Sequence, residues 1–273
     1  TYAAEKSRLE KFENLRFVEA DISNKRKMEK LFEEENFSYV VNFAAESHVD
    51  NSIESGKPFV RSNVEGAYTL MDVASQRDEL EKFIQISTDE VYGSVEKEKA
   101  KEGDTLKPSS PYSASKASAD MLANSFKVTH NLPVIIARPT NNFGPNQHKE
   151  KLIPKFINRA RKGKKLPVYG DGTNVRDWLY VKDNCRAIET LLKKGEPGEI
   201  YNIGANQFRE NIEVTKKILD LLGKDESLIE YVEDRKGHDQ RYAVDSSKIR
   251  DLGWEPKVEF EKGLKKTIKH YSK

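Results

Sequence analysis

A chain of 273 residues, of which 36% are hydrophobic, is long enough for one large or two smaller domains with a real core. Its 47 basic and 45 acidic residues leave a net charge of +2, which excludes a strongly single-signed surface for nucleic acid or a membrane. One cysteine, Cys185, allows no disulfide within the chain, and no apolar run approaches the roughly 18 residues of a membrane span. We expect a globular protein of the cytoplasm.

Apolar runs typical of buried parallel strands alternate with helical patterns in the first half of the chain. The predicted strands are Leu15–Ala20, Tyr39–Ala45, Phe83–Ser87 and Leu132–Ala137, and the predicted helices are Lys25–Glu35, Phe59–Arg77 and Pro111–His130. This βαβ order predicts an α/β fold with a Rossmann-like doubly wound parallel sheet. Functional side chains should then follow the carboxyl ends of the strands.

The sequence changes character after Pro139. Gly, Pro and Asn cluster at 141–146, and Gly170-Asp171-Gly172 predicts a hairpin turn. We expect domains at 1–140 and 141–273, the second mainly a smaller mixed α/β lobe with some segments returning to the first. Its predicted elements are helices at Lys151–Arg161, Val181–Lys193, Asn211–Leu222 and from Glu261, and strands near Gly198–Ile203 and Ser227–Glu233. The charged run Glu96–Asp104 is expected to be a solvated loop.

Two motifs bear chemically useful groups. Thr88, Asp89 and Glu90 follow an apolar run, and two carboxyls in different surroundings can serve as an acid and a base. Tyr112 and Lys116 lie four residues apart in a predicted helix, so the ammonium should lower the pKa of the phenol and favour a tyrosinate base. Taken singly, the acids could cap a helix and the Tyr–Lys pair could be a surface pair. Together they suit redox chemistry coupled to loss of water.

In combination these motifs resemble the dTDP-glucose 4,6-dehydratases of the extended short-chain dehydrogenase/reductase family. The resemblance runs through nearly the whole chain. Its segments are Asn42–Asp50, Asn63–Gly66, Ser87–Gly93, Ser109–Ser118, Asn141–Pro145, Glu150–Pro154, Arg176–Val181, Tyr201–Gly204 and Gly237–Asp239.

The resemblance implies NAD as the cofactor, dTDP-glucose as the substrate and five catalytic residues. Tyr112, with Lys116 beside it, would deprotonate the C4 hydroxyl while hydride passes to NAD, and Thr88 would hydrogen-bond that oxygen. Glu90 would remove the C5 proton while a protonated Asp89 donates to the departing C6 hydroxyl. Return of hydride to C6 would give a 4-keto-6-deoxy sugar nucleotide, a precursor in deoxysugar synthesis such as that of rhamnose.

The resemblance also implies the binding residues and a homodimer. The cofactor residues would be Asp21, Ile22, Phe43, Ala44, Ala45, Ser47, Asn63, Tyr112, Lys116 and Asn142. The substrate residues would be Ser47, Thr88, Asn141, Lys151, Leu152, Pro167, Val168, Tyr169, Arg176, Asn211, Arg235 and His238, with guanidinium groups suited to a diphosphate. The dimer would use the two long helices, where Tyr68, Leu70, Met71, Met121, Leu122 and Phe126 could equally be core. No His or Cys cluster has zinc spacing, so no metal site is expected.

One part of the family pattern has no counterpart here. The family opens with a strand and a Gly-rich turn whose N–H groups hold the cofactor pyrophosphate. Thr1-Tyr2-Ala3 resembles the segment after the second strand. We therefore expect the first βαβ unit to be missing and NAD binding by this chain alone to be weak.

Two alternatives stay open. One is a 4,6-dehydratase or an epimerase for another nucleotide sugar, although such epimerases lack the acid and base pair of Asp89 and Glu90. The other is a non-catalytic subunit of the same fold, which the absent Gly-rich turn suggests. Such a subunit would have no physical reason to retain all five catalytic side chains.

Overall fold

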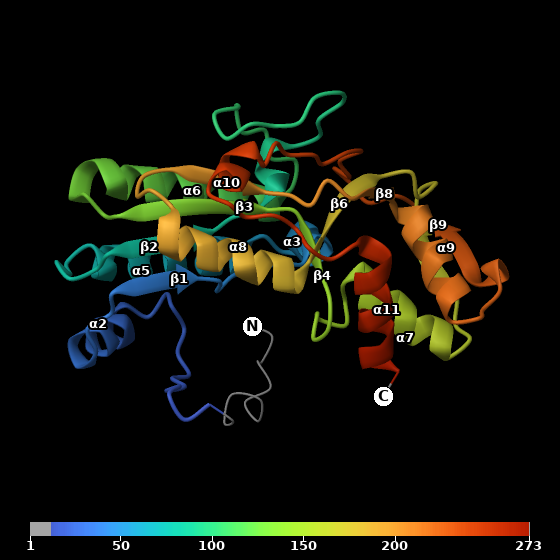
Figure 1. Cartoon of the computed structure of the whole chain (residues 1–273), viewed down its shortest axis with the longest axis horizontal. Coiled ribbons are helices and arrows are strands. Elements are labelled where there is room, and N and C mark those ends of the chain that lie inside the picture. The colour runs from blue at the N-terminus through green and yellow to red at the C-terminus, as the bar shows by residue number, and fades with distance from the viewer. Residues whose placement is uncertain (1–11, 273) are drawn as a thin grey trace.

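A four-stranded parallel sheet forms the centre of the larger lobe in the computed structural model, which describes residues 12–272 (Figure 1). Its strands are β1 (Tyr39–Asn42), β2 (Lys82–Ile86), β3 (Val134–Pro139) and β7 (Ile200–Ile203), in the order β1-β2-β3-β7. The predicted doubly wound parallel sheet is thereby confirmed. The segment Thr1–Ala3, on which the missing βαβ unit was argued, lies outside the described residues.

Helices cover both faces of this sheet because successive strand residues point to opposite sides. Phe83 packs with α2 (Lys25–Glu34), α5 (Gly66–Ala74) and α6 (Pro111–His130) on one face. Ile84, its neighbour, packs with α8 (Val181–Lys194) and α10 (Ser247–Asp251) on the other. Strands buried on both sides favour continuous apolar runs, which is why these strands could be predicted from the sequence.

The predicted strand Leu15–Ala20 is wrong. This segment runs as irregular chain into α2, and Leu15, Phe17 and Val18 are 43%, 43% and 44% exposed. A strand needs a partner for its backbone N–H and C=O groups, and none of the described strands pairs with this segment. The apolar run alone does not show whether a neighbouring strand is available to pair with it.

The helix predicted over Phe59–Arg77 is interrupted. It consists of α4 (Lys57–Phe59), a π-helical segment (Val60–Glu65) and α5. The short helix α3 (Val49–Glu54) precedes it and follows β1 closely. The π-helical segment holds Asn63, whose side chain is buried at the edge of the site described below.

In the part of the smaller lobe that the structure describes there are two further sheets and three helices. One sheet has the order β4 (Asn141–Phe143), β6 (Val175–Tyr180), β8 (Phe208–Glu210), and the other pairs β5 (Leu166–Tyr169) with β9 (Ile229–Val232). The helices are α7 (Leu152–Arg161), α9 (Asn211–Leu221) and α11 (Phe260–Tyr271), which share an apolar cluster with these strands. In Figure 1 β9 and α9 lie at the end of the molecule away from β1 and β2.

The predicted hairpin at Gly170–Gly172 is also wrong. The chain does turn there, with φ angles of +55° at Gly170 and +77° at Gly172 that favour glycine. However, β5 pairs in parallel with β9, whereas β6 pairs with β4 and β8. The turn therefore passes the chain from one sheet to another, a choice that local turn chemistry does not determine.

Segments from the second half of the chain return to the larger lobe. The strand β7 follows α8 and completes the main sheet beside β3. The charged run Glu96–Asp104 has exposed side chains, but its Ala100 is buried and pairs with the chain near Ala243 and Asp245 through bonds of 2.9 and 2.8 Å. None of the described helices is long and apolar enough to cross a membrane.

Candidate active site

The acidic motif lies just beyond the carboxyl end of β2. A short 3-10 helix, Asp89–Tyr92, begins there, and Thr88 caps it by accepting a 3.3 Å bond from the Glu90 N–H. The Thr88 hydroxyl also donates to Asp89 Oδ1 at 3.2 Å. The strand end therefore fixes the threonine and both carboxyls in one place.

The Tyr–Lys motif is positioned by the first turns of α6. Ser110 and Ser113 form a capping box, with reciprocal bonds of 3.1 and 3.0 Å between backbone N–H and side-chain oxygen. Tyr112 and Lys116 follow one turn apart, and both are buried. The Lys116 ammonium donates to the Ile86 carbonyl at the end of β2, so the two predicted motifs meet.

The two adjacent carboxyls have different electrostatic surroundings. Burial, and next the charge of Glu90, raise the pKa of Asp89 well above its ordinary value. Burial also raises the pKa of Glu90, but the cations Arg235, Arg176 and Lys151 oppose that rise. The pKa of Asp89 is therefore raised further than that of Glu90, although Arg176 opposes the rise at both carboxyls and Arg235 and Lys151 oppose it at Glu90.

The expected lowering of the Tyr112 pKa is wrong for this structure. Burial raises the pKa of Tyr112, the Glu90 charge adds to the rise, and a hydrogen bond with Thr88 opposes it. Burial lowers the pKa of Lys116 to about 8, with Asp120 opposing that change. Desolvation disfavours the charged form of each group and outweighs the attraction expected between the phenol and the ammonium.

A buried polar network lies behind Lys116. Arg138 donates from Nε to Asp120 Oδ2 at 2.9 Å and from Nη1 to the Tyr92 hydroxyl at 2.6 Å. The Tyr92 hydroxyl donates in turn to Asn202 Oδ1 at 2.8 Å on β7. This network was not predicted from the sequence, although a single arginine within the apolar run of β3 was a signal that a partner must exist.

A cavity of about 180 Å³ lies between the sheet edge and the smaller lobe. All of the predicted substrate residues except Thr88 line it, and Glu90 lines it as well. The predicted set is Ser47, Asn141, Lys151, Leu152, Pro167, Val168, Tyr169, Arg176, Asn211, Arg235 and His238. The structure therefore brings these residues together from two lobes and several elements.

Two cations of the cavity, Arg176 and Lys151, are held by neutral partners. Arg176 donates to the carbonyls of Val175 and Asp239 at 2.8 and 2.9 Å, and its guanidinium stacks 4.2 Å from the Tyr242 ring. The Lys151 ammonium donates to the Ser47 carbonyl. Charges balanced by carbonyls and an aromatic ring keep most of their attraction for an anionic ligand such as a diphosphate.

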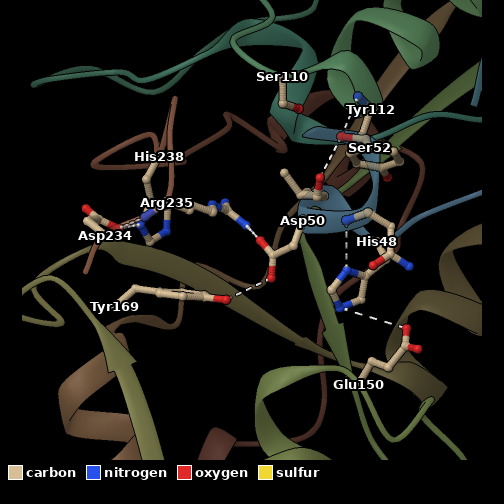
Figure 2. Close-up of polar contacts among 12 residues, drawn as sticks. His48, Asp50, Ser52, Ser110, Tyr112, Glu150, Tyr169, Asp234, Arg235 and His238 are labelled. Carbon is tan, nitrogen blue, oxygen red and sulfur yellow. Dashed lines mark hydrogen bonds and ion pairs between the residues drawn. The ribbon is translucent and has the colours of Figure 1, made fainter. Parts of the chain in front are cut away.

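Several lining residues were not predicted. The Tyr242 hydroxyl lies 2.7 Å from Asp239 Oδ2 and 3.5 Å from Glu90 Oε2. Asp50 lies between Tyr169 and Arg235 (Figure 2). Asp50 and Asp239 fall within segments that carried the family resemblance, which was the one available signal.

The proposed cofactor residues lie before α2, after β1, in the π-helical segment, on α6 and within β4. Phe43 follows β1 and is 60% exposed, and the small residues Ala44 and Ala45 follow it. Asn142 Oδ1 is buried without a hydrogen-bond partner among the described residues, so it can accept from a carboxamide. An exposed aromatic ring, small residues and an unpaired acceptor fit a dinucleotide at this edge.

The remaining cofactor positions are tied to neighbouring protein groups. Asp21 accepts from the Ser23 N–H and hydroxyl and from Arg61, at 3.0, 2.8 and 3.0 Å. Asn63 bonds the backbone of Glu46 and, at 2.9 Å, the Ser115 hydroxyl beside Lys116. Ile22 packs against the core under α5. Within residues 12–272, no cluster of three or more His, Cys, Asp or Glu side chains is placed to hold a metal ion.

Comparisons with known proteins agree with this geometry. A family model described as GDP-mannose 4,6 dehydratase matches residues 2–267. The low-salt glycan biosynthesis protein Agl12 of Haloferax volcanii is 52% identical over 99% of this chain and 87% of its own length. A dTDP-glucose 4,6-dehydratase of Streptomyces griseus is 50% identical over 86% of this chain and 71% of its own length. The crystal structure of DesIV, a dTDP-glucose 4,6-dehydratase from Streptomyces venezuelae with NAD bound, matches with a TM-score of 0.96 and 43% identity, over 100% of this chain and 85% of that one.

Proposed function

The chain belongs to the GDP-mannose 4,6-dehydratase family of extended short-chain dehydrogenases/reductases, and from this premise we propose that it dehydrates dTDP-glucose to dTDP-4-keto-6-deoxyglucose with NAD as cofactor. One observation supports this most directly. Asp89 and Glu90 are adjacent carboxyls with unequal surroundings, next to a cavity lined by cations. Elimination of water beside a ketone needs one acid and one base.

The proposed roles of Asp89 and Glu90 follow from the different surroundings of the two carboxyls, and those of Tyr112, Thr88 and Lys116 follow from the family resemblance. Tyr112 takes the proton of the C4 hydroxyl, Thr88 hydrogen-bonds the same oxygen, and Lys116 supplies positive charge one helical turn away. Glu90, with Arg235, Arg176 and Lys151 favouring its carboxylate, takes the C5 proton. Asp89, held protonated by burial, gives its proton to the departing C6 hydroxyl.

When bound, NAD would supply the acceptor for the C4 hydride and the donor for its return to C6, so it would end each turnover unchanged. The residues proposed to hold it are Asp21, Ile22, Phe43, Ala44, Ala45, Ser47, Asn63, Tyr112, Lys116 and Asn142. The cavity residues with Arg176 and Arg235 are proposed to bind the nucleotide sugar, since guanidinium groups suit its diphosphate.

Further parts of the proposal rest on the family. We propose a homodimer, a role in deoxysugar synthesis such as that of rhamnose, and a place in the cytoplasm, where nucleotide sugars and NAD are made. We also propose that residues 1–140 form mainly the cofactor domain and residues 141–273 mainly the sugar-nucleotide lobe. The separate apolar cluster of α7, α9 and α11 supports that division.

The test is turnover in heavy water. The purified protein is incubated with dTDP-glucose and NAD in D2O, and the products are followed by NMR. We expect a 4-keto-6-deoxy sugar nucleotide with deuterium at C5, because Glu90 exchanges its proton with solvent before the double bond is reduced. Formation of the C4 epimer without loss of water, or no product with saturating NAD, would contradict the proposal.

A further inference from the structure

Asp50 connects the two lobes at the cavity. It lies on α3, directly after β1, and its side chain reaches two residues of the smaller lobe (Figure 2). Its Oδ2 accepts a 2.9 Å bond from the Tyr169 hydroxyl at the end of β5. Its Oδ1 lies 3.6 Å from Nη1 of Arg235, in the loop after β9. All three residues line the cavity.

Tyr169, one partner of Asp50, also contacts a residue of its own lobe. The Tyr169 ring meets His238 edge to face, with ring centres 6.2 Å apart, and His238 Nδ1 lies 2.6 Å from Asp234 Oδ1. Arg235 Nε is buried and makes no hydrogen bond to the described residues. Among the described residues, the Arg235 side chain forms an ion pair with Asp50 at a distance longer than a hydrogen bond, and Asp50 Oδ1 also makes no hydrogen bond.

A carboxylate is an unexpected group in this position. The cavity is lined by Lys151, Lys155, Arg176 and Arg235, which suits an anion, and the proposed substrate carries a diphosphate. By charge alone, Asp50 repels such a ligand. Its presence therefore suggests a compensating benefit, and ordering Tyr169 and Arg235 before the ligand arrives is one that these contacts can provide.

We propose that Asp50 is a positioning residue for nucleotide binding, which holds Tyr169 and Arg235 in their binding orientation from the opposite lobe. This inference rests on the proposed function in one respect, that a nucleoside diphosphate occupies the cavity. Asp50 itself takes no part in the proton transfers assigned to Tyr112, Asp89 and Glu90.

The test compares Asp50→Asn with Tyr169→Phe by calorimetric titration with dTDP, UDP and GDP. Asp50→Asn keeps the shape of the side chain and removes its charge, whereas Tyr169→Phe removes only the hydroxyl that Asp50 binds. In wild type, Asp50 would order two side chains before the nucleotide binds, which lowers the entropy cost of binding. Each variant should therefore weaken binding of the preferred nucleotide about three- to tenfold. The double variant should bind about as weakly as the weaker single variant, since both remove one shared contact.

Steady-state kinetics separate positioning from a general loss of structure. With dTDP-glucose, KM should rise with the dissociation constant while kcat stays within about twofold, a split that a destabilised fold would not produce. Glu54→Gln, an exposed acid on the same helix, is the matched control and should bind like wild type. If Asp50→Asn does not fold, Tyr169→Phe is used alone. This variant keeps the methylene and the ring of Tyr169, so its packing is unchanged.

The opposite results are equally clear. Tighter binding by Asp50→Asn with unchanged binding by Tyr169→Phe would show that Asp50 acts only by repulsion and would overturn the inference. Unchanged binding in both variants, or a wild-type protein that binds none of the three nucleotides, would also overturn it. Wild-type protein that binds a nucleotide but fails to dehydrate dTDP-glucose would refute the proposed function instead.

Discussion

At the scale of single residues, the contrast between Asp89 and Glu90 makes the most specific prediction. Glu90→Gln removes the C5 base but leaves Tyr112, Thr88 and Lys116 in place. We expect kcat to fall by a factor of about 100 or more, while oxidation at C4 still proceeds and reduced cofactor accumulates. Absorbance of the reduced nicotinamide, followed after rapid mixing with dTDP-glucose, measures both steps.

The matched variant is Asp89→Asn, which keeps the base and removes the acid. It should exchange the C5 proton with D2O but release water slowly. If Glu90→Gln lost the reduced cofactor signal, or if Asp89→Asn lost C5 exchange, the assignment of base and acid would be reversed or wrong.

Lys116 allows a prediction about stability and pH. Its pKa falls from an ordinary 10.5 to about 8 in the folded chain. Below about pH 8 both folded and unfolded chains hold the proton, so the cost of burying the charge, about 3 kcal/mol, is present in full. As the pH rises from 8 to 10.5 the folded state releases the proton first, and this cost is lost.

We therefore expect Lys116→Met to be inactive but more stable than wild type at pH 7, by up to about 3 kcal/mol, with the gap narrowing by pH 10. Urea unfolding at both pH values measures it. Lys97→Met, at an exposed position, should show no such pH-dependent gap. If Lys116→Met and wild type differed in free energy of unfolding by the same amount at both pH values, burial would not be the cause of the lowered Lys116 pKa.

At the scale of elements, α3 joins the nucleotide cavity to the catalytic helix. Ser52, two residues after Asp50, is buried, donates to the Val49 carbonyl and accepts a 3.2 Å bond from the Tyr112 N–H (Figure 2). Ser52→Ala leaves that N–H unpaired and loosens the first turn of α6. We expect kcat to fall about fivefold, equivalent to about 1 kcal/mol, while nucleotide affinity is unchanged.

Steady-state kinetics and nucleotide titration check this expectation. Ser118→Ala is a suitable control, because its hydroxyl bonds the Ala114 carbonyl within α6 and holds no neighbouring element. Weaker nucleotide binding in Ser52→Ala, with kcat unchanged, would show that α3 does not act on Tyr112 in this way.

Elements that depend on neighbouring residues in the sequence could be predicted, and elements that depend on distant residues could not. The helix α6 was predicted with its observed bounds, since Pro111 suits a first turn. In the structure Asn131 ends this helix in a left-handed conformation. The strand at Leu15–Ala20 and the hairpin at Gly170–Gly172 failed because pairing depends on distant segments.

The same reasoning applies to the site. Most of the cavity lining followed from the family resemblance, residue by residue. The contact of Asp50 with Tyr169 spans 119 positions and two lobes, and no local pattern indicates it. Likewise, the pKa of Tyr112 depends on burial, which the Tyr–Lys spacing does not reveal.

At the scale of the whole molecule, the proposed dimer can be tested at α5 and α6. Three of the candidate interface residues, Leu70, Met71 and Phe126, are buried in the core, and Leu122 packs against it. Tyr68 and Met121 remain 46% and 64% exposed on these neighbouring helices. The sequence could not separate these two groups, because both occur at apolar helical positions.

Met121→Lys should therefore disrupt the dimer, since it places a charge within an apolar contact. Light scattering coupled to size-exclusion chromatography should give a mass near 31.2 kDa in place of twice that value. Tyr231→Lys, at an exposed position of the other lobe, should leave the mass unchanged. A Met121→Lys protein that stays dimeric would place the interface elsewhere.

The small sheet of β5 and β9 has a consequence for how such a protein can change. Tyr169 ends β5 and Arg235 follows β9, whereas the groups proposed to act on the sugar follow β2 or lie on α6. Recognition of the nucleotide and catalysis on the sugar would thus depend on separate parts of the chain. Residues 166–172 and 229–238 could be replaced with those of a relative that prefers another nucleotide. The variant should then accept that other nucleotide sugar and still dehydrate it.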